Sequence, residues 1–182
     1  MNVASSGDAG LVARIRATLR DVPDFPRPGI LFRDITPLLG DATLFVEATS
    51  AMAAPFAGRG ITHVAGIEAR GFIFAAPIAQ VLGAGFIPVR KPGKLPARTL
   101  RRAYGLEYGA DALEVHVDAC PPDSHILVVD DVLATGGTAE AAVALLEEAG
   151  GVVAGVSFLL AIEALGGAAR LARYDILRVV AL

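Results

Sequence analysis

The segment at residues 126–138, ILVVDDVLATGGT, constrains the fold of this chain more than any other. Four apolar residues are followed by the adjacent carboxylates Asp130 and Asp131, a short spacer and the turn TGGT. A helix-like segment, AEAAVALLEEAG, comes next. This pattern predicts a buried strand that carries two acids at its carboxyl end, followed by a glycine-rich turn that opens a helix. Loop amides and a helix N-terminus can bind phosphate, and paired acids can bind vicinal hydroxyls, so the segment predicts a site for a phosphorylated sugar.

The chain lacks the other common phosphate-binding signatures. It contains no GxxxxGK[ST] loop and no GxGxxG after a predicted strand, which favours a monophosphate over a nucleotide triphosphate or a dinucleotide. Gly136 and Gly137 allow the backbone to approach a ligand closely, and Thr135 and Thr138 add hydroxyl donors. The alternative is an ordinary strand-to-helix loop with solvated acids. The acid pair directly after the apolar run favours the sugar-phosphate site.

Apolar runs alternate with helix-like segments along the chain. The apolar runs predict strands at 63–68, 85–90, 113–118, 126–129, 152–162 and 175–182. Helical spacing predicts helices at 11–20, about 43–56, 70–82, 139–150 and about 165–173. Residues 21–40 are too rich in proline to form one regular element, and residues 91–112 are polar and contain glycine, which is typical of a mobile excursion. The alternation predicts an α/β fold with a mainly parallel sheet covered on both faces, with ligands at the carboxyl ends of its strands.

Length, charge and cysteine content exclude several classes of protein. A chain of 182 residues suits a single domain, 1–182, with a full core. A net charge of −3 argues against nonspecific nucleic-acid binding. No apolar stretch approaches the length of a membrane span, and the first ten residues do not resemble a signal peptide. The lone Cys120 excludes an intramolecular disulfide and a cysteine-based zinc site. We therefore expect a cytoplasmic protein that binds small molecules, with no nucleic-acid or membrane partner.

Three further segments carry candidate chemistry. In GIEARGFIF, Glu68 and Arg70 flank a turn that could bind pyrophosphate or could form only a surface salt bridge. Residues 89–109 begin with the only two lysines of the chain and end in Glu107–Tyr108, so they form either a lid or a solvated loop. Residues 25–39 hold aromatic side chains among prolines, which could stack a flat heterocycle or could pack on the core.

The segment at 126–138 resembles the phosphoribosyl-diphosphate (PRPP) signature of the type I phosphoribosyltransferases. FPRPGILFRDITPLL, GIEARGFIF, RKPGKLP, LEYG and VVDDVLATGGT occur in this order, and together they resemble the adenine phosphoribosyltransferases of that family over residues 20–140. The resemblance implies a type I phosphoribosyltransferase-like fold with an N-terminal hood at about 21–40 and a mobile catalytic loop at about 91–112. It also implies a homodimer.

The resemblance further implies roles for individual residues. The residues expected to bind PRPP are Arg70, Arg90, Lys91, Lys94, Asp130, Asp131, Ala134, Thr135, Gly136, Gly137 and Thr138. The residues expected to bind adenine are Leu31, Phe32, Arg33 and Ile162, with Phe32 stacked on the base. The expected catalytic residues are Glu107, Arg70 and Tyr108, of which Glu107 is the acid/base residue near the purine N7 and N9. Mg²⁺ is the expected cofactor, held through substrate and water with no direct protein ligand.

The implied activity is that of a pentosyltransferase in purine salvage, which converts adenine and PRPP to AMP and pyrophosphate through an oxocarbenium-like transition state. One alternative is a phosphoribosyltransferase for a 6-oxo purine, which usually places a lysine near the purine, whereas both lysines here follow the predicted strand at 85–90. Another is a non-catalytic regulator that senses PRPP. Such a regulator would need a DNA-binding domain, and the segment before residue 21 is too short for a winged helix.

Overall fold

The computed structural model describes residues 3–4, 8–106 and 109–182 and has a six-stranded sheet at its centre. The strand order is β1 (Val3–Ala4), β10 (Ile176–Ala181), β9 (Val152–Ala161), β8 (His125–Leu133), β4 (His63–Ile67) and β5 (Gly85–Val89). Each neighbouring pair is parallel. The mainly parallel sheet that the alternating pattern predicts is thereby confirmed. The short strand β1 was not predicted.

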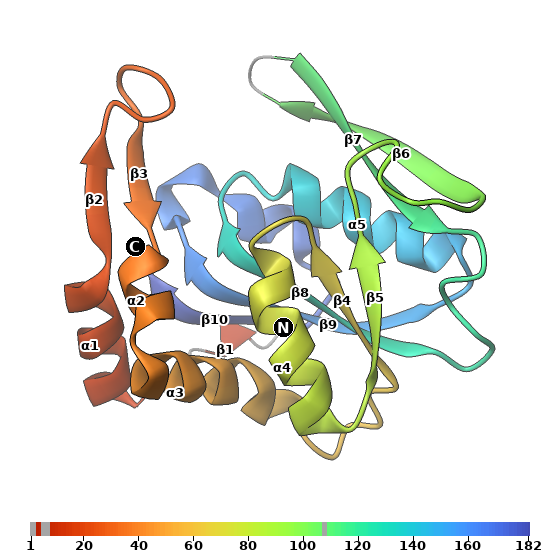
Figure 1. Ribbon diagram of the computed structural model, residues 1–182, viewed down its shortest axis with the longest axis horizontal. Helices are drawn as coiled ribbons and strands as arrows, with labels where there is room; N and C mark the ends of the chain where they lie inside the picture. The colour runs from red at the N-terminus through yellow and green to blue at the C-terminus, as the bar shows by residue number, and fades with distance from the viewer. Residues whose placement is uncertain (1–2, 5–7, 107–108) are drawn as a thin grey trace.

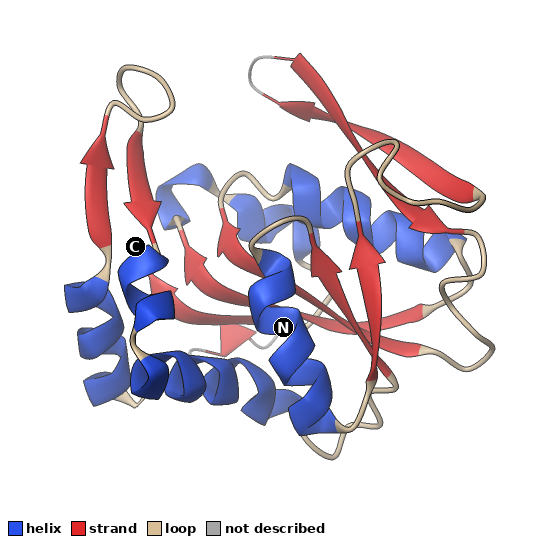
Figure 2. Cartoon of the chain, viewed as in Figure 1, coloured by secondary structure: helices blue, strands red, loops and turns tan. Residues whose placement is uncertain are grey.

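Helices cover both faces of this sheet, as Figures 1 and 2 show. The helices α1 (Ala9–Thr18), α3 (Ala42–Ala53) and α4 (Gly71–Leu82) lie on one face, and α5 (Gly137–Glu148) lies on the other. The predicted helices at 11–20, 43–56, 70–82 and 139–150 are confirmed to within a few residues. The helix α3 is extended by the 3₁₀ turn η1 (Ala54–Phe56).

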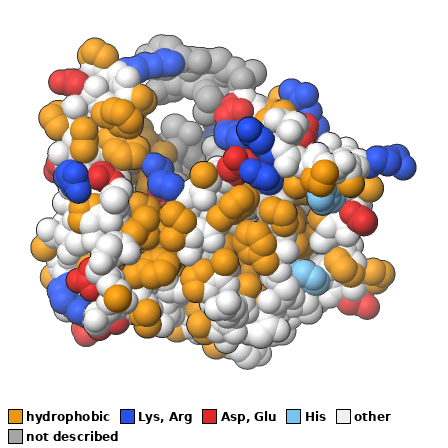
Figure 3. All heavy atoms as spheres, in the orientation of Figure 1, with side chains coloured by type: hydrophobic (Ala, Val, Ile, Leu, Met, Phe, Trp, Pro, Cys, Tyr) orange, Lys and Arg blue, Asp and Glu red, His pale blue; other side chains and the backbone are white. Residues whose placement is uncertain are grey.

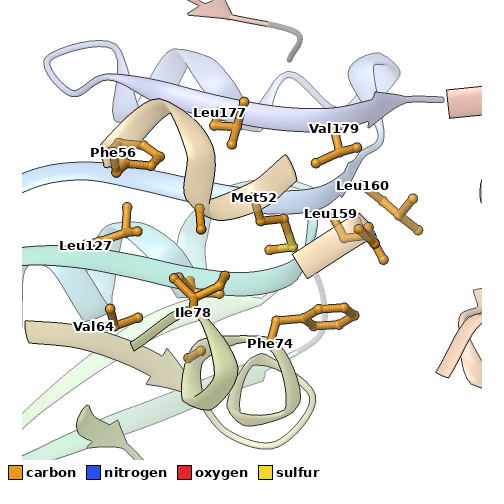
Figure 4. Packing of buried hydrophobic residues seen from close by; sticks show 14 of the residues in the cluster. Met52, Phe56, Val64, Phe74, Ile78, Leu127, Leu159, Leu160, Leu177 and Val179 are labelled. Carbon is orange, nitrogen blue, oxygen red and sulfur yellow. The ribbon is translucent and has the colours of Figure 1, made fainter. Parts of the chain in front are cut away.

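The core lies in two layers because strand residues alternate between the two faces. Val64, Leu127 and Val129 belong to the cluster beneath α3 and α4, which Figure 4 shows from close by. Their neighbours Ala65 and Val128 belong to the cluster on the opposite face. All five residues have 0% exposure. A strand buried on both faces needs an unbroken apolar run, which explains the composition of the predicted strands.

Two antiparallel hairpins project beyond the sheet at the carboxyl ends of its strands (Figure 1). The first, which we call the hood hairpin, pairs β2 (Arg20–Pro23) with β3 (Leu31–Asp34) and leads into α2 (Thr36–Gly40). Residues 21–40 are therefore not one regular element, as predicted. The second, which we call the ribbon, pairs β6 (Thr99–Leu106) with β7 (Gly109–His116).

Two local predictions were wrong, and a third had the wrong bounds. Most of the expected excursion at 91–112 is regular, because β6 pairs with β7 along its length and the ribbon packs on α5. The expected strand at 113–118 is only the second half of β7. The helix expected at 165–173 is instead two 3₁₀ turns, η2 (Glu163–Leu165) and η3 (Gly167–Leu171), interrupted at Gly166, which has a φ of +65°. Among the described residues, no helix has both the length and the apolarity needed to cross a membrane.

Candidate functional site

A cavity of about 540 Å³ lies at the carboxyl ends of the central strands, between the hood hairpin and the ribbon. Figure 3 shows the surface hollowed between these two projections. The predicted site residues that line the cavity are Leu31, Phe32, Arg33, Arg70, Lys91, Asp130, Asp131, Ala134, Thr135, Gly136, Thr138 and Ile162. Three predicted residues, Arg90, Lys94 and Gly137, do not line it. Glu107 and Tyr108 lie outside the described residues.

The acid pair lies within β8, which continues to Leu133 instead of ending before the acids. The Asp131 side chain is only 6% exposed, and the Arg70 guanidinium donates a hydrogen bond to it through Nε. The Asp131 N–H donates to Asp130 Oδ1 over 2.9 Å. Burial, together with the neighbouring charge of Asp131, raises the pKa of Asp130 well above the ordinary range of an aspartate. The carboxyl oxygens of the pair can accept hydrogen bonds from two neighbouring hydroxyl groups.

Gly71, at the start of α4, permits the close approach of this helix to the acid pair. A Cβ atom at this position would lie 2.9 Å from Asp130 Oδ1 and 2.9 Å from the Val129 carbonyl oxygen. Glycine therefore lets the turn that carries Arg70 pack directly against β8 at Val129 and Asp130.

The phosphate loop, which we define as Ala134–Thr138, connects β8 to the N-terminus of α5. Gly136 has a φ of +82°, a conformation that glycine adopts without steric cost. A Cβ atom at Gly136 would lie 2.5 Å from the carbonyl oxygen of Gly167, and a Cβ atom at Gly167 would lie 2.2 Å from that of Ala134. The phosphate loop is therefore packed backbone to backbone against the start of η3. The N–H groups at the start of α5 suit an anion such as a phosphate.

The turn after β4 is linked to the loop after β5 through Glu68. Its carboxylate accepts hydrogen bonds from Arg90 Nε at 3.2 Å and from the Lys91 N–H at 2.9 Å. Burial raises the pKa of Glu68, but these two hydrogen bonds and the charges of Arg90 and Lys94 together outweigh burial, and the pKa lies below its usual value. Arg90 also donates to the Lys94 carbonyl oxygen over 3.0 Å. The Arg90 guanidinium thus connects two loops of the protein and does not line the cavity.

The hood side of the cavity is apolar and aromatic. Phe32 in β3 lines it, and Phe25 packs edge to face on Phe32 with ring centroids 5.1 Å apart. The Arg70 guanidinium carbon lies 5.2 Å from the centroid of the Phe32 ring. Ile162, directly after β9, lies at the same cavity. A flat heterocycle that replaced the Arg70 guanidinium over Phe32 would gain a stacking surface.

Sequence reasoning missed several residues of this cavity. Those that line it without having been singled out are Ile30, Ala69, Tyr104, Val132, Leu133, Ala139 and Leu165; Glu68, which also lines it, was singled out only as part of the turn with Arg70. The position of Val132 and Leu133, between the acid pair and the phosphate loop, was a signal that could have identified them. No local signal pointed to Tyr104, because its proximity to the cavity depends on the pairing of the ribbon. Among the described residues, no cluster of three or more His, Cys, Asp or Glu side chains could hold a metal ion.

The chain is similar to known proteins over most of its length. Residues 47–168 match the model of the phosphoribosyl transferase domain. The adenine phosphoribosyltransferase of Myxococcus xanthus is 56% identical over 171 residues, which cover 94% of this chain and 93% of that protein. The enzyme of the same name from Thermobifida fusca is 56% identical over 158 residues, which cover 87% of this chain and 90% of that protein.

Solved structures agree with these sequence matches. The crystal structure of adenine phosphoribosyltransferase from Rhodothermus marinus superposes with a TM-score of 0.92 at 49% identity, covering 96% of this chain and 100% of that one. The Saccharomyces cerevisiae enzyme, crystallised with an imino-altritol bisphosphate and adenine, has a TM-score of 0.86 at 34% identity, covering 93% of this chain and 98% of that one. The sheet, the acid pair and the phosphate loop thus occur in a chain that belongs to the phosphoribosyltransferase family, among the adenine phosphoribosyltransferases.

Proposed function

We propose that the protein transfers the 5-phosphoribosyl group of PRPP to N9 of adenine, with AMP and pyrophosphate as products. The observation that carries the proposal is one cavity lined by the acid pair, the phosphate loop and the aromatic side of the hood hairpin. The adenine bound by the yeast relative supports the assignment of the base. The acid pair suits the ribose hydroxyls, the phosphate loop suits the phosphate, and the aromatic side of the hood hairpin suits the purine.

On this proposal the ribose 5-phosphate half of PRPP binds at the carboxyl end of β8. The N–H groups of the phosphate loop and the N-terminus of α5 hold the 5′-phosphate. Asp130 and Asp131 hold the ribose 2′- and 3′-hydroxyls. In this structure Arg70 is paired with Asp131, so the arrival of a pyrophosphate group would draw Arg70 away and leave Asp131 to the ribose.

The chemical step separates charge, and the protein stabilises the negatively charged leaving group. Departure of pyrophosphate from C1 leaves positive charge on the ribose ring and negative charge on the pyrophosphate. Arg70 and Lys91 neutralise the negative charge. Phe32 stacks on adenine and places N9 over C1, which is a positioning effect. Glu107, assigned by resemblance, accepts the proton that leaves N9, a contribution of about 10²–10⁴-fold in rate.

Magnesium completes the proposal as the cofactor. The carboxyl oxygens of Asp130 and Asp131 are the hard donors that Mg²⁺ prefers, but they belong to only two side chains, one of which is engaged by Arg70. This donor set fits an ion held mainly by pyrophosphate oxygens, ribose hydroxyls and water. When bound, Mg²⁺ would neutralise charge on the leaving pyrophosphate.

We also propose that the enzyme acts in the cytoplasm as a homodimer. Exposed apolar side chains on α4 and on the adjacent strand β5 support the dimer, namely Ile73 (39% exposed), Val81 (62%) and Phe86 (40%). Hydrophobic side chains gather on the face of the molecule that carries α3 and α4 (Figure 3). Sedimentation of the purified protein measures the mass, and a monomer at micromolar concentration would refute the homodimer.

The activity is tested with a set of four purine bases as substrates. Purified protein is incubated with PRPP, Mg²⁺ and each of adenine, hypoxanthine, guanine and xanthine, and the nucleotide formed is quantified by chromatography. AMP from adenine alone is the expected result. Turnover of an oxo-purine would retain the PRPP site but overturn the assignment of the hood. PRPP binding without turnover of any base would favour the regulator.

A further inference from the structure

Lys91 is held at the rim of the cavity by two residues of the ribbon. Its ammonium donates a hydrogen bond to the Tyr104 hydroxyl over 2.9 Å and forms an ion pair with Asp111. The Tyr104 hydroxyl in turn donates to Asp111 Oδ2 over 3.1 Å. Figure 3 shows basic and acidic side chains gathered beside the hollow, where the ribbon meets the rest of the protein.

Lys91, Tyr104 and Asp111 thus form a hydrogen-bonded triangle in which each hydrogen bond joins a donor to an acceptor. The Tyr104 oxygen accepts from Lys91 and its hydroxyl hydrogen goes to Asp111, whose other oxygen, Oδ1, accepts the Ala112 N–H over 2.8 Å. An ammonium group has three donors. Among the described residues, Tyr104 and Asp111 take the hydrogen bonds of Nζ, which leaves one N–H for a ligand.

The two ribbon residues form a fixed support for a flexible side chain. Tyr104 in β6 and Asp111 in β7 are directly paired across the ribbon, and Tyr104 is only 9% exposed, with its ring in the hydrophobic cluster beneath α5. Lysine has four rotatable side-chain bonds and loses considerable conformational entropy when it binds a ligand in one orientation. A support that orders the side chain beforehand reduces that cost at the moment of binding.

Lys91 lies where it can contact a ligand, whereas Asp111 can only support Lys91. Lys91 and Tyr104 line the cavity, whereas Asp111 does not. Lys94, the other lysine of the chain, does not line it either. Lys91 is thus the lysine that faces the space beside Arg70, where the proposed mechanism requires positive charge.

The charges that face Lys91 keep it protonated. Burial lowers the pKa of Lys91, but the hydrogen bonds and charge of Asp111 and Tyr104 outweigh burial and raise the pKa above its usual value. Glu68, on the turn after β4, accepts the Lys91 backbone N–H. The cations nearby are Arg90, which Glu68 neutralises, and Arg70, which Asp131 neutralises.

We propose that Asp111 is a positioning residue of the pyrophosphate site: through its contacts with Lys91 and Tyr104 it fixes the Lys91 ammonium at the cavity rim, with one N–H directed to a pyrophosphate oxygen. This inference rests on the proposed function. Asp111 acts through Lys91 and does not touch the substrate.

The test compares Asp111→Asn with Glu148→Gln. Glu148 forms an ion pair of 3.6 Å with Arg102 of the same ribbon but does not line the cavity, so its variant makes the same change in charge at a second ribbon contact. Asp111→Asn is expected to raise the KM for PRPP and the Kd for pyrophosphate about tenfold, the size expected for a hydrogen bond to a charged group. The Kd for AMP, which lacks the pyrophosphate, and kcat should change less than about threefold. Glu148→Gln should match the wild type.

A pH profile distinguishes positioning from a general loss of structure. Without the Asp111 charge the pKa of Lys91 falls, so the alkaline limb of kcat/KM for PRPP should move to lower pH in Asp111→Asn and return in part in Asp111→Glu. A folded Asp111→Asn protein with wild-type pyrophosphate affinity and a wild-type alkaline limb would overturn the proposal.

Tyr104→Phe decides the matter if Asp111→Asn does not fold. It removes one hydroxyl from the triangle without changing the charge, and it should raise the Kd for pyrophosphate by about threefold. No rise would overturn the proposal. Failure of the wild type to form AMP would instead refute the proposed function, and the pyrophosphate titrations would still judge the role of Asp111.

Discussion

Replacement of Gly167 by alanine tests whether the position of the phosphate loop limits catalysis. The new Cβ atom would lie 2.2 Å from the Ala134 carbonyl oxygen and 2.8 Å from the Gly136 nitrogen. Ordinary contact begins at 3.4 Å, so the Ala134 oxygen would have to move away by about 1.2 Å. Because both neighbours are backbone atoms, no side-chain rotation can relieve the overlap. The phosphate loop or η3 must shift.

The expected magnitudes follow from this displacement. Overpacking of this kind destabilises a protein by about 1–3 kcal/mol, which lowers the Tm of a chain of this size by about 2–4 °C per kcal/mol. The substitution should also slow catalysis, because a misplacement of about 1 Å can cost about 100-fold in rate. We expect kcat/KM for PRPP to fall about 100-fold and ribose 5-phosphate to bind more weakly. Initial rates of AMP formation, calorimetric titration with ribose 5-phosphate and thermal unfolding measure the three effects.

Gly10→Ala is the matched control for this substitution. Gly10 lies in the first turn of α1, and an added Cβ atom there would have its nearest neighbour at 3.5 Å, an ordinary contact. The control should retain wild-type kcat/KM. If folded Gly167→Ala protein also retained wild-type kcat/KM and bound ribose 5-phosphate normally, the close packing of Gly136 and Gly167 would not determine the geometry of the site.

Four other substitutions, at three residues, test separate parts of the site. Glu107→Gln should lower kcat by at least about tenfold, because a general acid or base typically contributes about 10²–10⁴-fold in rate. A near-normal kcat would show that Glu107 does not have that role. Asp130→Ala should chiefly weaken the use of PRPP, and unchanged PRPP kinetics would count against a ribose contact. Asp130→Asn should also change the pH dependence of stability. The pKa of Asp130 is raised in the folded protein, so the wild type loses stability as the pH rises from the ordinary aspartate pKa through the raised value. Asp130→Asn should lack that loss. Identical profiles of Tm against pH for the two proteins, measured from about pH 4 to about pH 8, would contradict this prediction. Phe32→Ala should raise the KM for adenine about tenfold through lost stacking and burial, with the KM for PRPP little changed; an unaltered adenine KM would exclude stacking on this ring.

The local elements of the site were predictable from the sequence because their signals are local. An apolar run followed by Asp130 and Asp131 predicts a buried strand that ends in two acids, and the adjacent glycines predict a turn into a helix. The alternation of such segments is enough for a parallel α/β sheet, since a strand buried on both faces requires a continuous apolar run. The convergence of several strand ends at one cavity then follows from the parallel arrangement.

The tertiary structure decided how these local elements meet. The pairing of β6 with β7 brings Tyr104 and Asp111 together and places them against Lys91. The sequence did not predict this pairing, because the ribbon carries exposed polar residues. Arg90, assigned to PRPP by resemblance, donates a hydrogen bond to Glu68 on the turn after β4, a contact that no local pattern indicated.

By itself, the sequence determined the alternating strands and helices of the central sheet, the acid pair and the glycine-rich loop, because each depends on the preferences of neighbouring residues. Only the tertiary structure decided the support of that loop by Gly167, about thirty residues further along the chain, and the burial that raises the pKa of Asp130. Backbone contact and burial depend on residues distant in sequence, and no local periodicity encodes them.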